Sequence, residues 1–334
     1  MNGHQLVAAG SAEPRLEPVE RPAPGRGELR IRAAYSLVSP GTELHYLDRA
    51  ARTGERFPLG YCSSGTVHDA GAHAPGFAPG QPVIAMGWGE AVHGDVVVVP
   101  YRQCVPVPPG LPLPSAVVAN LGATAVHAVD RAGLTPHDEV AVVGAGAVGL
   151  LVAQTAAAAG GGPVTVLDRR DERLDAAAAL GLAAAAELPA TRAETGGRVV
   201  FLCVTGAADD TLAAAARWAA AAPGRPRLIA VGRFTATVRF SVELGNVDIR
   251  YAARCGAGYR DPQYARGLRE VDPPPGEGTV TQNLTRALDL VSAGAVAPAA
   301  MALPVVRVED APAAYAELRR RPRHAAVLID HREG

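Results

Sequence analysis

Apolar and polar positions follow two different patterns along the 334-residue chain. Through the first third, short apolar runs alternate with Gly and Pro, as at residues 28–34, 65–67, 81–85 and 95–99. This spacing predicts the short strands of a small β-barrel-like domain. From Asp138 onward, alanine-rich stretches long enough for helices separate the apolar runs. Because strands and helices then alternate, the pattern predicts a parallel, doubly wound α/β sheet.

The second pattern also predicts individual elements. Strands are predicted at EVAVVG (139–144), PVTVLD (163–168), VVFLCV (199–204) and RLIAVG (227–232), and helices near 147–159, 171–180 and 209–222. A stretch rich in Pro, Gly and charge at 268–279 predicts an exposed loop. Beyond it, helices are predicted around 282–292 and 309–320, followed by a closing strand at 325–330.

A glycine-rich turn joins the first of these strands to its helix. In VAVVGAGAVGLLVAQ, the residues Gly144, Gly146 and Gly149 form a G-x-G-x-x-G motif. The first glycine permits a tight turn, the second lets the backbone approach a diphosphate, and the third lets helix and strand pack closely. Free N–H groups at the helix start favour the negative charge of that diphosphate. The motif therefore predicts a dinucleotide site, which includes Ala147 and Val148.

An acidic residue ends the second strand of this unit. Asp168 follows Gly149 by about 20 residues, as the ribose-binding carboxylate does in dinucleotide-binding folds. A carboxylate accepts bonds from two ribose hydroxyls and repels a 2′-phosphate, so Asp168 favours NAD. The neighbouring Arg169 and Arg170 could hold that phosphate, which leaves NADP open. The predicted cofactor site comprises the motif residues with Asp168, Arg169, Val204 and Gly232.

The composition narrows the partners. Basic and acidic residues number 32 and 33, so no strong field is available to hold nucleic acid or an anionic membrane surface. No lysine is present, which excludes Schiff-base catalysis and a P-loop lysine. The four cysteines are widely spaced, the start has no signal-peptide pattern and no apolar stretch approaches a membrane span. We therefore expect a cytoplasmic protein with a small-molecule substrate, without nucleic acid or membrane partners.

These motifs together resemble the medium-chain dehydrogenase/reductase family, over nearly the whole chain. The resemblance implies a GroES-like β-barrel catalytic domain (1–120), a Rossmann dinucleotide-binding domain (121–256) and a C-terminal segment (257–334) that returns to the first domain. It also implies a homodimer. Within the family, SLVSPGTELH resembles a metal-free branch that includes bacteriochlorophyllide hydroxyethyl dehydrogenases. The stretch CGAGYRDPQYARG resembles part of the sugar and cyclitol oxidoreductases.

Zinc alcohol dehydrogenases of this family hold a catalytic zinc ion through three side chains. The resemblance puts Pro40 at the first ligand, a cysteine in those enzymes, and Tyr61 at the second, a histidine. Cys62 stands at the glutamate that follows this histidine, and the third ligand falls near residues 119–120, Ala and Asn here. Zinc needs three or four N, S or O donors in a tetrahedral array. No metal is therefore expected.

Without a metal, carbonyl reduction needs another donor near the oxygen that becomes an alkoxide. Tyr61 stands where a zinc ligand would, and its phenol can donate a proton. Thr42 and His45 match the hydroxyl and imidazole of the family's proton relay, so these three residues form the predicted catalytic group. Two alternatives stay open, in which Tyr61 only walls the pocket and His45 is a surface imidazole. An unorthodox metal site of Cys62, Glu43 and His45 is a third.

Weaker signals assign some further residues. The family's basic residue near the start of the last strand is replaced by Ala325. Arg323 and His324 are the candidates to substitute for it. The other candidates for the cleft are His93, His127 and Tyr259, whereas Cys104, Cys203 and Cys255 are expected to be buried and apolar.

The leading interpretation is a metal-independent oxidoreductase of secondary metabolism. It would transfer a hydride between NAD, or NADP, and a secondary alcohol or ketone of a small polar metabolite such as a sugar, polyol or cyclitol. A second interpretation is a zinc-free quinone or enoyl reductase, against which Asp168 argues because many such relatives use NADPH. A third is a dinucleotide-binding protein without catalysis.

Overall fold

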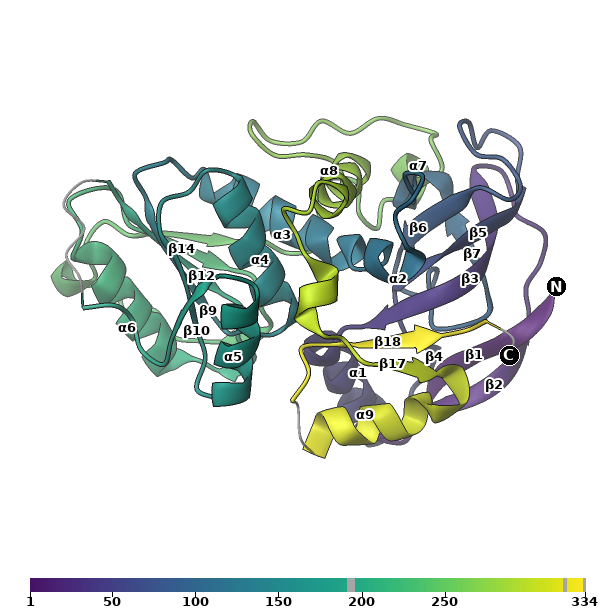
Figure 1. Ribbon diagram of the computed structural model, residues 1–334, viewed down its shortest axis with the longest axis horizontal. Helices are drawn as coiled ribbons and strands as arrows, with labels where there is room; N and C mark the ends of the chain where they lie inside the picture. The colour runs from purple at the N-terminus through teal and green to yellow at the C-terminus, as the bar shows by residue number, and fades with distance from the viewer. Residues whose placement is uncertain (191–195, 321–322, 333–334) are drawn as a thin grey trace.

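Two large sheets organise the protein. The computed structural model describes residues 1–190, 196–320 and 323–332. In Figure 1, a parallel sheet with its helices forms the left half of the molecule and a mixed sheet forms the right half. Helices α3 (Ala119–Ala132) and α8 (Val280–Ser292) lie between them.

The parallel sheet has six strands in the order β11-β10-β9-β12-β14-β16. Its strands are β9 (Glu139–Val143), β10 (Val164–Leu167), β11 (Ala183–Ala185), β12 (Arg198–Leu202), β14 (Arg227–Ala230) and β16 (Asp248–Tyr251). The connecting helices are α4 (Ala147–Ala158), α5 (Asp171–Ala179) and α6 (Asp209–Ala220). The chain runs outward from β9 in one direction and then from β12 in the other. The predicted doubly wound sheet is thus confirmed, and its switch point lies between β9 and β12, where such folds bind ligands.

The mixed sheet combines the first third of the chain with its last strands. It contains β3 (Glu28–Val38), β5 (Cys62–Ala70), β6 (Pro82–Met86), β7 (Val96–Pro100) and β8 (Cys104–Pro106), together with β17 (Val305–Arg307) and β18 (Val327–Asp330). Strand β18 pairs antiparallel with β3, so the predicted closing strand does return to the first region. Helix α9 (Ala311–Arg320) connects β17 to β18.

Several elements were not predicted from the sequence. A three-stranded sheet forms from β1 (Asn2–Ala9), β2 (Arg15–Glu20) and β4 (Arg56–Pro58). Helix α1 (Pro40–Thr53), which has 14 residues, was not predicted. Helix α3 was also missed. The remaining short elements are α2 (Leu113–Ala116), α7 (Pro262–Ala265), β13 (Gly206–Ala207) and β15 (Phe234–Thr235). No helix among the described residues is long and apolar enough to span a bilayer.

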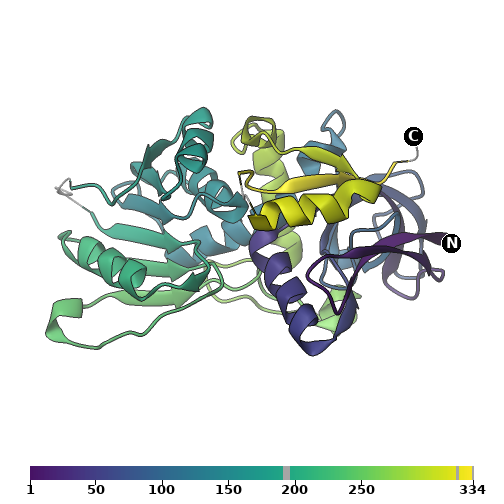
Figure 2. The ribbon, with the colours of Figure 1, turned by 90° about the horizontal axis from the view of Figure 1, so that it is seen from below.

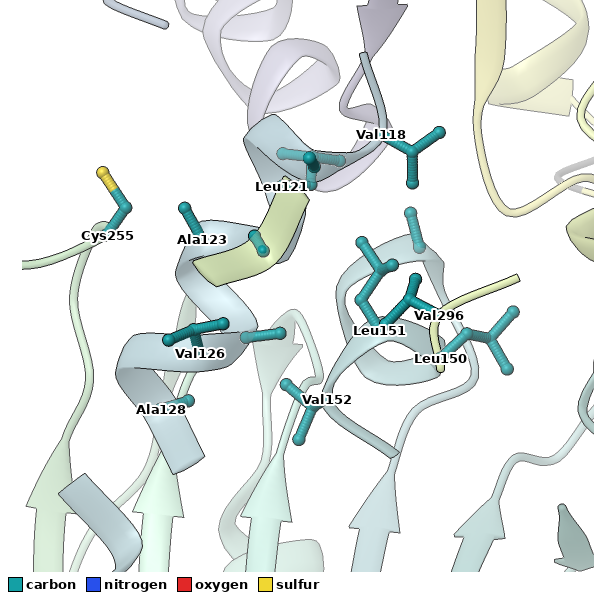
Figure 3. Packing of buried hydrophobic residues seen from close by; sticks show 14 of the residues in the cluster. Val118, Leu121, Ala123, Val126, Ala128, Leu150, Leu151, Val152, Cys255 and Val296 are labelled. Atoms are coloured by element: carbon teal, nitrogen blue, oxygen red, sulfur yellow. The ribbon is translucent and has the colours of Figure 1, made fainter. Parts of the chain in front are cut away.

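One continuous core joins the two halves. Figure 3 shows side chains of α3, α4 and the segment around Val296 gathered in a single apolar cluster. The same cluster includes Met86 from the mixed sheet and Phe201 from the parallel sheet, both at most 2% exposed. Full burial of such a side chain contributes about 1.5–3 kcal/mol. Packing of this kind fixes the two sheets relative to each other, which a site between them requires.

Helix α1 lies beside α9, as the view from below shows (Figure 2). Leu47 and Ala50 of α1 pack with Tyr315 and Leu318 of α9 in a second core cluster. The N-terminus of α1 begins at Pro40, directly after Ser39. The C-terminal part of the chain therefore supports the helix that carries Thr42 and His45, two of the three predicted catalytic residues.

Candidate active site

A cleft of about 1260 Å³ runs between the two halves of the molecule. It is lined from the parallel-sheet side by the ends of β9, β10, β12 and β14, and from the other side by α1 and the segments after β4 and β6. All nine predicted cofactor residues line it: Gly144, Gly146, Ala147, Val148, Gly149, Asp168, Arg169, Val204 and Gly232. The structure thus brings the whole predicted cofactor set together.

The glycine turn leaves no room for side chains. A Cβ at Gly149 would stand 1.8 Å from the carbonyl oxygen of Gly144. Gly144 has φ +103°, and a Cβ there would stand 2.6 Å from the carbonyl oxygen of Cys203. Gly146 caps α4 without any side-chain hydrogen bond. The first turn of α4 therefore opens to the cleft with its backbone N–H groups uncapped by side chains, as an anion site requires.

Asp168 holds this turn in place. Its Oδ2 accepts a hydrogen bond of 2.9 Å from the backbone N–H of Ala145, and its Oδ1 accepts one of 3.1 Å from Arg170. Arg173 donates to the carbonyl oxygen of Ala145 at 3.1 Å. Arg169, Arg170 and Arg173 all line the cleft beside Asp168. The carboxylate is thus a structural part of the turn as well as a candidate ribose ligand.

The predicted catalytic residues divide into two groups. Tyr61 and Thr42 line the cleft. Burial raises the pKa of the Tyr61 phenol well above its usual value, although hydrogen bonding with the hydroxyls of Ser39 and Thr42 opposes the shift. His45 is not among the cleft-lining residues, and its Nε2 lies 3.2 Å from Nη1 of Arg233, which does line the cleft. Partial burial and Arg233 lower the pKa of His45.

The position that holds zinc in related enzymes has different surroundings here. Cys62 is fully buried, and burial together with Glu43 raises the pKa of its thiol. The Nδ2 group of Asn120 donates to the carbonyl oxygen of Ser63 at 3.2 Å. Throughout residues 1–190, 196–320 and 323–332, no group of three or more His, Cys, Asp or Glu side chains is arranged to hold a metal ion. The alternative set of Cys62, Glu43 and His45 therefore does not form a ligand cluster.

Glu43 instead anchors a buried polar network that the sequence did not reveal. Its side chain is fully buried. Oε1 accepts the backbone N–H of Ser39 at 2.7 Å, and Oε2 lies 2.8 Å from Nε2 of His93 and accepts the hydroxyl of Tyr315. Ser39 lines the cleft. The buried carboxylate thus fixes the N-terminus of α1, where the cleft is formed.

The network continues away from the cleft. His93 Nδ1 lies 2.7 Å from Oγ of Ser36, which lies 2.8 Å from Nε2 of His331. His331 Nδ1 then lies 3.6 Å from Oδ1 of Asp95. Burial opposes ionisation of Asp95, but hydrogen bonds from His331 and His4 outweigh it and lower the pKa of this carboxyl group. The expectation that His93 lines the cleft was therefore wrong, because its ring is enclosed in this network.

Some of the predictions for further residues are confirmed and others are wrong. His127 is buried near Glu277, and neither Arg323 nor His324 lines the cleft, so these three expectations were wrong. Tyr259 does line it, and its hydroxyl lies near the backbone of Trp88. Cys104 and Cys255 are buried as expected, whereas Cys203 is only partly buried, and both Cys203 and Cys255 line the cleft.

Comparison with known proteins agrees with this geometry. No protein-family model matches the chain. The 2-desacetyl-2-hydroxyethyl bacteriochlorophyllide A dehydrogenase of Cereibacter sphaeroides is 31% identical over 185 residues, which cover 50% of this chain and 57% of that protein. The probable D-xylulose reductase A of Aspergillus niger is 37% identical over 78 residues, which cover 23% of this chain and 22% of that protein. The match thus spans less than two thirds of either relative.

A solved structure shares the fold along the whole length. The alcohol dehydrogenase TADH from Thermus sp. ATN1 superposes with a TM-score of 0.77 at 21% identity, covering 98% of this chain and 100% of that chain. The two-sheet architecture of the chain is thus also that of this α/β protein. The chain is thus similar in sequence to a bacteriochlorophyllide dehydrogenase over about half of its length, and in fold to an alcohol dehydrogenase over nearly all of it.

The buried network predicts a pH-dependent stability. Burial lowers the pKa of His331, so below about pH 6.5 the unfolded chain binds a proton that the folded chain does not. The contribution of a neutral His331 is therefore present above about pH 6.5 and is lost as the pH falls. We expect His331→Gln to reduce the loss of unfolding free energy between pH 7 and 5 by up to about 1.4 kcal/mol per pH unit, measured by urea denaturation.

Ser36→Ala is the matched control for this change. It removes the hydrogen-bond partner of His331 and leaves the titrating ring in place. Its stability should fall at every pH while the pH slope persists. An unchanged slope in His331→Gln would mean that the slope comes from other histidines, such as His45 and His127, whose pKa values are also lowered.

Proposed function

We propose that this protein is a metal-independent oxidoreductase that transfers a hydride between NAD and a secondary alcohol or ketone of a small polar metabolite. The observation that carries the proposal is the single cleft that joins the glycine turn to Tyr61 and Thr42. The names of the relatives, a hydroxyethyl dehydrogenase and a xylulose reductase, support an alcohol or polyol as substrate.

The residues present fit a dinucleotide. A side chain at Gly144 or Gly149 would collide with backbone, so the turn is built for a close approach of another molecule to its main chain. The uncapped start of α4 would bind the diphosphate, and Asp168 would bind the adenosine ribose. Val204 and Gly232 would line the path toward the nicotinamide. When bound, the nicotinamide ring supplies or accepts the hydride.

The chain's own residues would manage the proton. The raised pKa of Tyr61 keeps its phenol neutral, so it can donate a proton to an oxygen that gains negative charge. The Thr42 hydroxyl, which lies close enough to this phenol to lower its pKa, would carry the proton onward. His45 would exchange it with solvent at the edge of the cleft, beside Arg233. Metal independence is supported by the neutral, buried thiol of Cys62 and by the engagement of Glu43 in the buried network.

The cofactor preference depends on the charge of Asp168. Asp168→Asn keeps one acceptor oxygen, which can serve the N–H group of Ala145 or of Arg170 but not both, and removes the charge that repels a 2′-phosphate. We expect roughly tenfold weaker NADH binding and tighter NADPH binding, measured by calorimetric titration. Glu187→Gln, which removes the other carboxylate that lines the cleft, should change neither affinity by more than about twofold. A wild-type protein that prefers NADPH would show that the neighbouring arginines dominate.

The chemistry depends on Tyr61. After exhaustive dialysis against a chelator, the wild-type protein should still oxidise polyols or reduce ketones, and Tyr61→Phe should lower kcat about 10²- to 10⁴-fold with little change in KM. Thr42→Val should cost less, because water can replace part of a relay. Loss of all activity on dialysis, restored by zinc, would refute metal independence. Turnover of enones but not of alcohols or ketones would favour the reductase interpretation.

A homodimer is the assembly we propose. Strand β16 is an unpaired edge of the parallel sheet, with Ile249 and Tyr251 exposed, and Phe240 and Val242 nearby in the chain are 87% and 94% exposed. Pairing of two such edges would cover these side chains. We expect a particle of two 34.3 kDa chains by light scattering, and Ile249→Glu should shift it toward one chain. A monomer at all concentrations would exclude this assembly.

A further inference from the structure

The strand order places the two ends of the cleft far apart. Asp168 follows β10, the glycine turn follows β9, and Val204 and Gly232 follow β12 and β14. The next strand in the sheet is β16, and the chain beyond it carries Arg254 and Arg260 into the cleft lining. Because β16 is three strand spacings from β9, this end lies roughly 14 Å from the glycine turn. It is the end opposite to the adenosine position.

Both arginines occupy an unusual backbone conformation. Arg254 has φ +67° and Arg260 has φ +64°, a region that side chains other than Gly, Asn and Asp rarely adopt. They account for two of the four non-glycine residues with positive φ in the described chain. Strain of this kind persists only where the surrounding structure holds it, and it concentrates at ligand-binding positions. A glycine would adopt this backbone conformation more easily at either position. The presence of arginine there therefore indicates a role for the guanidinium groups.

Packing directs this segment toward Tyr61. The sulfur of Cys255 lies 3.3 Å from that of Met86, at the end of β6. The guanidinium carbon of Arg254 lies 5.8 Å from the ring centre of Tyr259, whose hydroxyl lies near the backbone of Trp88. The ring of Trp88 is in turn 5.9 Å from the ring of Tyr61. The two arginines therefore flank a segment that packs beside the candidate proton donor.

No acidic group neutralises these arginines inside the cleft. The carboxylates among the cleft-lining residues are Asp168 and Glu187, and both follow the strands of the adenosine end. Neither Arg254 nor Arg260 has an ion pair within 4.0 Å among the described residues. The charges of Glu90 and Arg260 interact, but the two side chains form no ion pair within 4.0 Å. Oε2 of Glu90 accepts a hydrogen bond from Gln103 instead. At this end of the cleft, two guanidinium groups are thus left without a direct ion-pair partner among the described residues.

We propose that Arg254 and Arg260 bind an anionic group of the substrate, either a phosphate ester or a carboxylate, and so fix its alcohol or carbonyl beside Tyr61. Arginine suits this task because its planar guanidinium donates two parallel hydrogen bonds to either anion. The inference rests on the proposed function in that it assigns a substrate class to the same cleft. The phosphates of the cofactor are a poor alternative, because the turn after β9 provides for the diphosphate and Asp168 with its arginines provides for the ribose end.

A binding experiment tests the anion site without any turnover. Inorganic phosphate is titrated calorimetrically into the protein, alone and saturated with NADH, for the wild type, Arg254→Gln, Arg260→Gln and the double variant. Glutamine keeps a polar side chain of similar reach at each strained position. Loss of charge-assisted hydrogen bonds should weaken phosphate binding roughly 10- to 100-fold in the double variant, with melting temperature and NADH affinity preserved. Arg239→Gln, an exposed arginine outside the cleft, is the matched control and should leave binding unchanged.

Turnover then distinguishes the two sources of the anion. Each polyol is compared with its terminal phosphate ester, and each secondary alcohol with the corresponding hydroxycarboxylate. Wild-type kcat/KM should be higher for one charged partner. Arg254→Gln and Arg260→Gln should each lower kcat/KM for the charged substrate roughly tenfold or more, through a higher KM. For the neutral substrate, kcat/KM should change less than about threefold. Arg254→Lys should recover part of the loss, since it restores the charge.

Three outcomes separate this inference from the proposed function. In one outcome, phosphate binding depends on the two arginines but the protein transfers a hydride to or from no compound. This outcome would support the anion site and refute the oxidoreductase. In a second outcome, kcat/KM is the same for neutral alcohols and their charged partners and does not change in either variant. This outcome would support the oxidoreductase and refute the anion site. Phosphate binding that is unchanged in the double variant would also refute it.

Discussion

The architecture of the cleft depends on one buried carboxylate. Glu43 is fully enclosed, and an ionisable group in that position must be satisfied by hydrogen bonds. Its partners are the backbone of Ser39, the ring of His93 and the hydroxyl of Tyr315, which come from three distant parts of the chain. This arrangement ties α9 to the helix that forms one wall of the cleft. The C-terminal segment therefore does more than close the mixed sheet, because it also sets the position of Ser39 and Thr42.

The sequence predicted β9, β10, β12 and β14 of the parallel sheet, since each is a short, mainly apolar run and the first three are each followed by a helix. It did not predict the two edge strands, β11 and β16. It missed β1, β2 and β4, in which buried and exposed positions are irregular, and α3. The α3 segment ANLGATAVHAVDRA is buried almost all round, so it lacks the polar face that marks a surface helix. Both failures have the same cause, because tertiary packing rather than local pattern determines these elements.

In the candidate site, too, the sequence predicted the residues with a local signal and missed those that tertiary packing brings together. The cofactor residues were predicted because their signal is local: a turn that only glycine permits, and a carboxylate at a fixed distance along the chain. The network around Glu43 joins residues up to about 295 positions apart, as between Ser36 and His331, and no spacing rule covers such pairs. The prediction that His93 lines the cleft was wrong, since a sequence does not distinguish a buried imidazole from one that lines a cleft. The backbone conformation of Arg254 and Arg260 likewise has no sequence signature, because arginine normally avoids it.

The charge states of the groups in the cleft bear directly on the proposed reaction. In the proposed reaction an oxygen gains negative charge, and the thiol of Cys62 and the phenols of Tyr61 and Tyr259 all have raised pKa values that keep them neutral. The interior can therefore donate hydrogen bonds but supplies no cation. Positive charge reaches the cleft only from arginines such as Arg254, at its periphery. In the proposed reaction, an arrangement of this kind would separate the two tasks that a zinc ion would combine. Neutral donors would act at the reacting oxygen, and peripheral arginines would hold the substrate by a group remote from it.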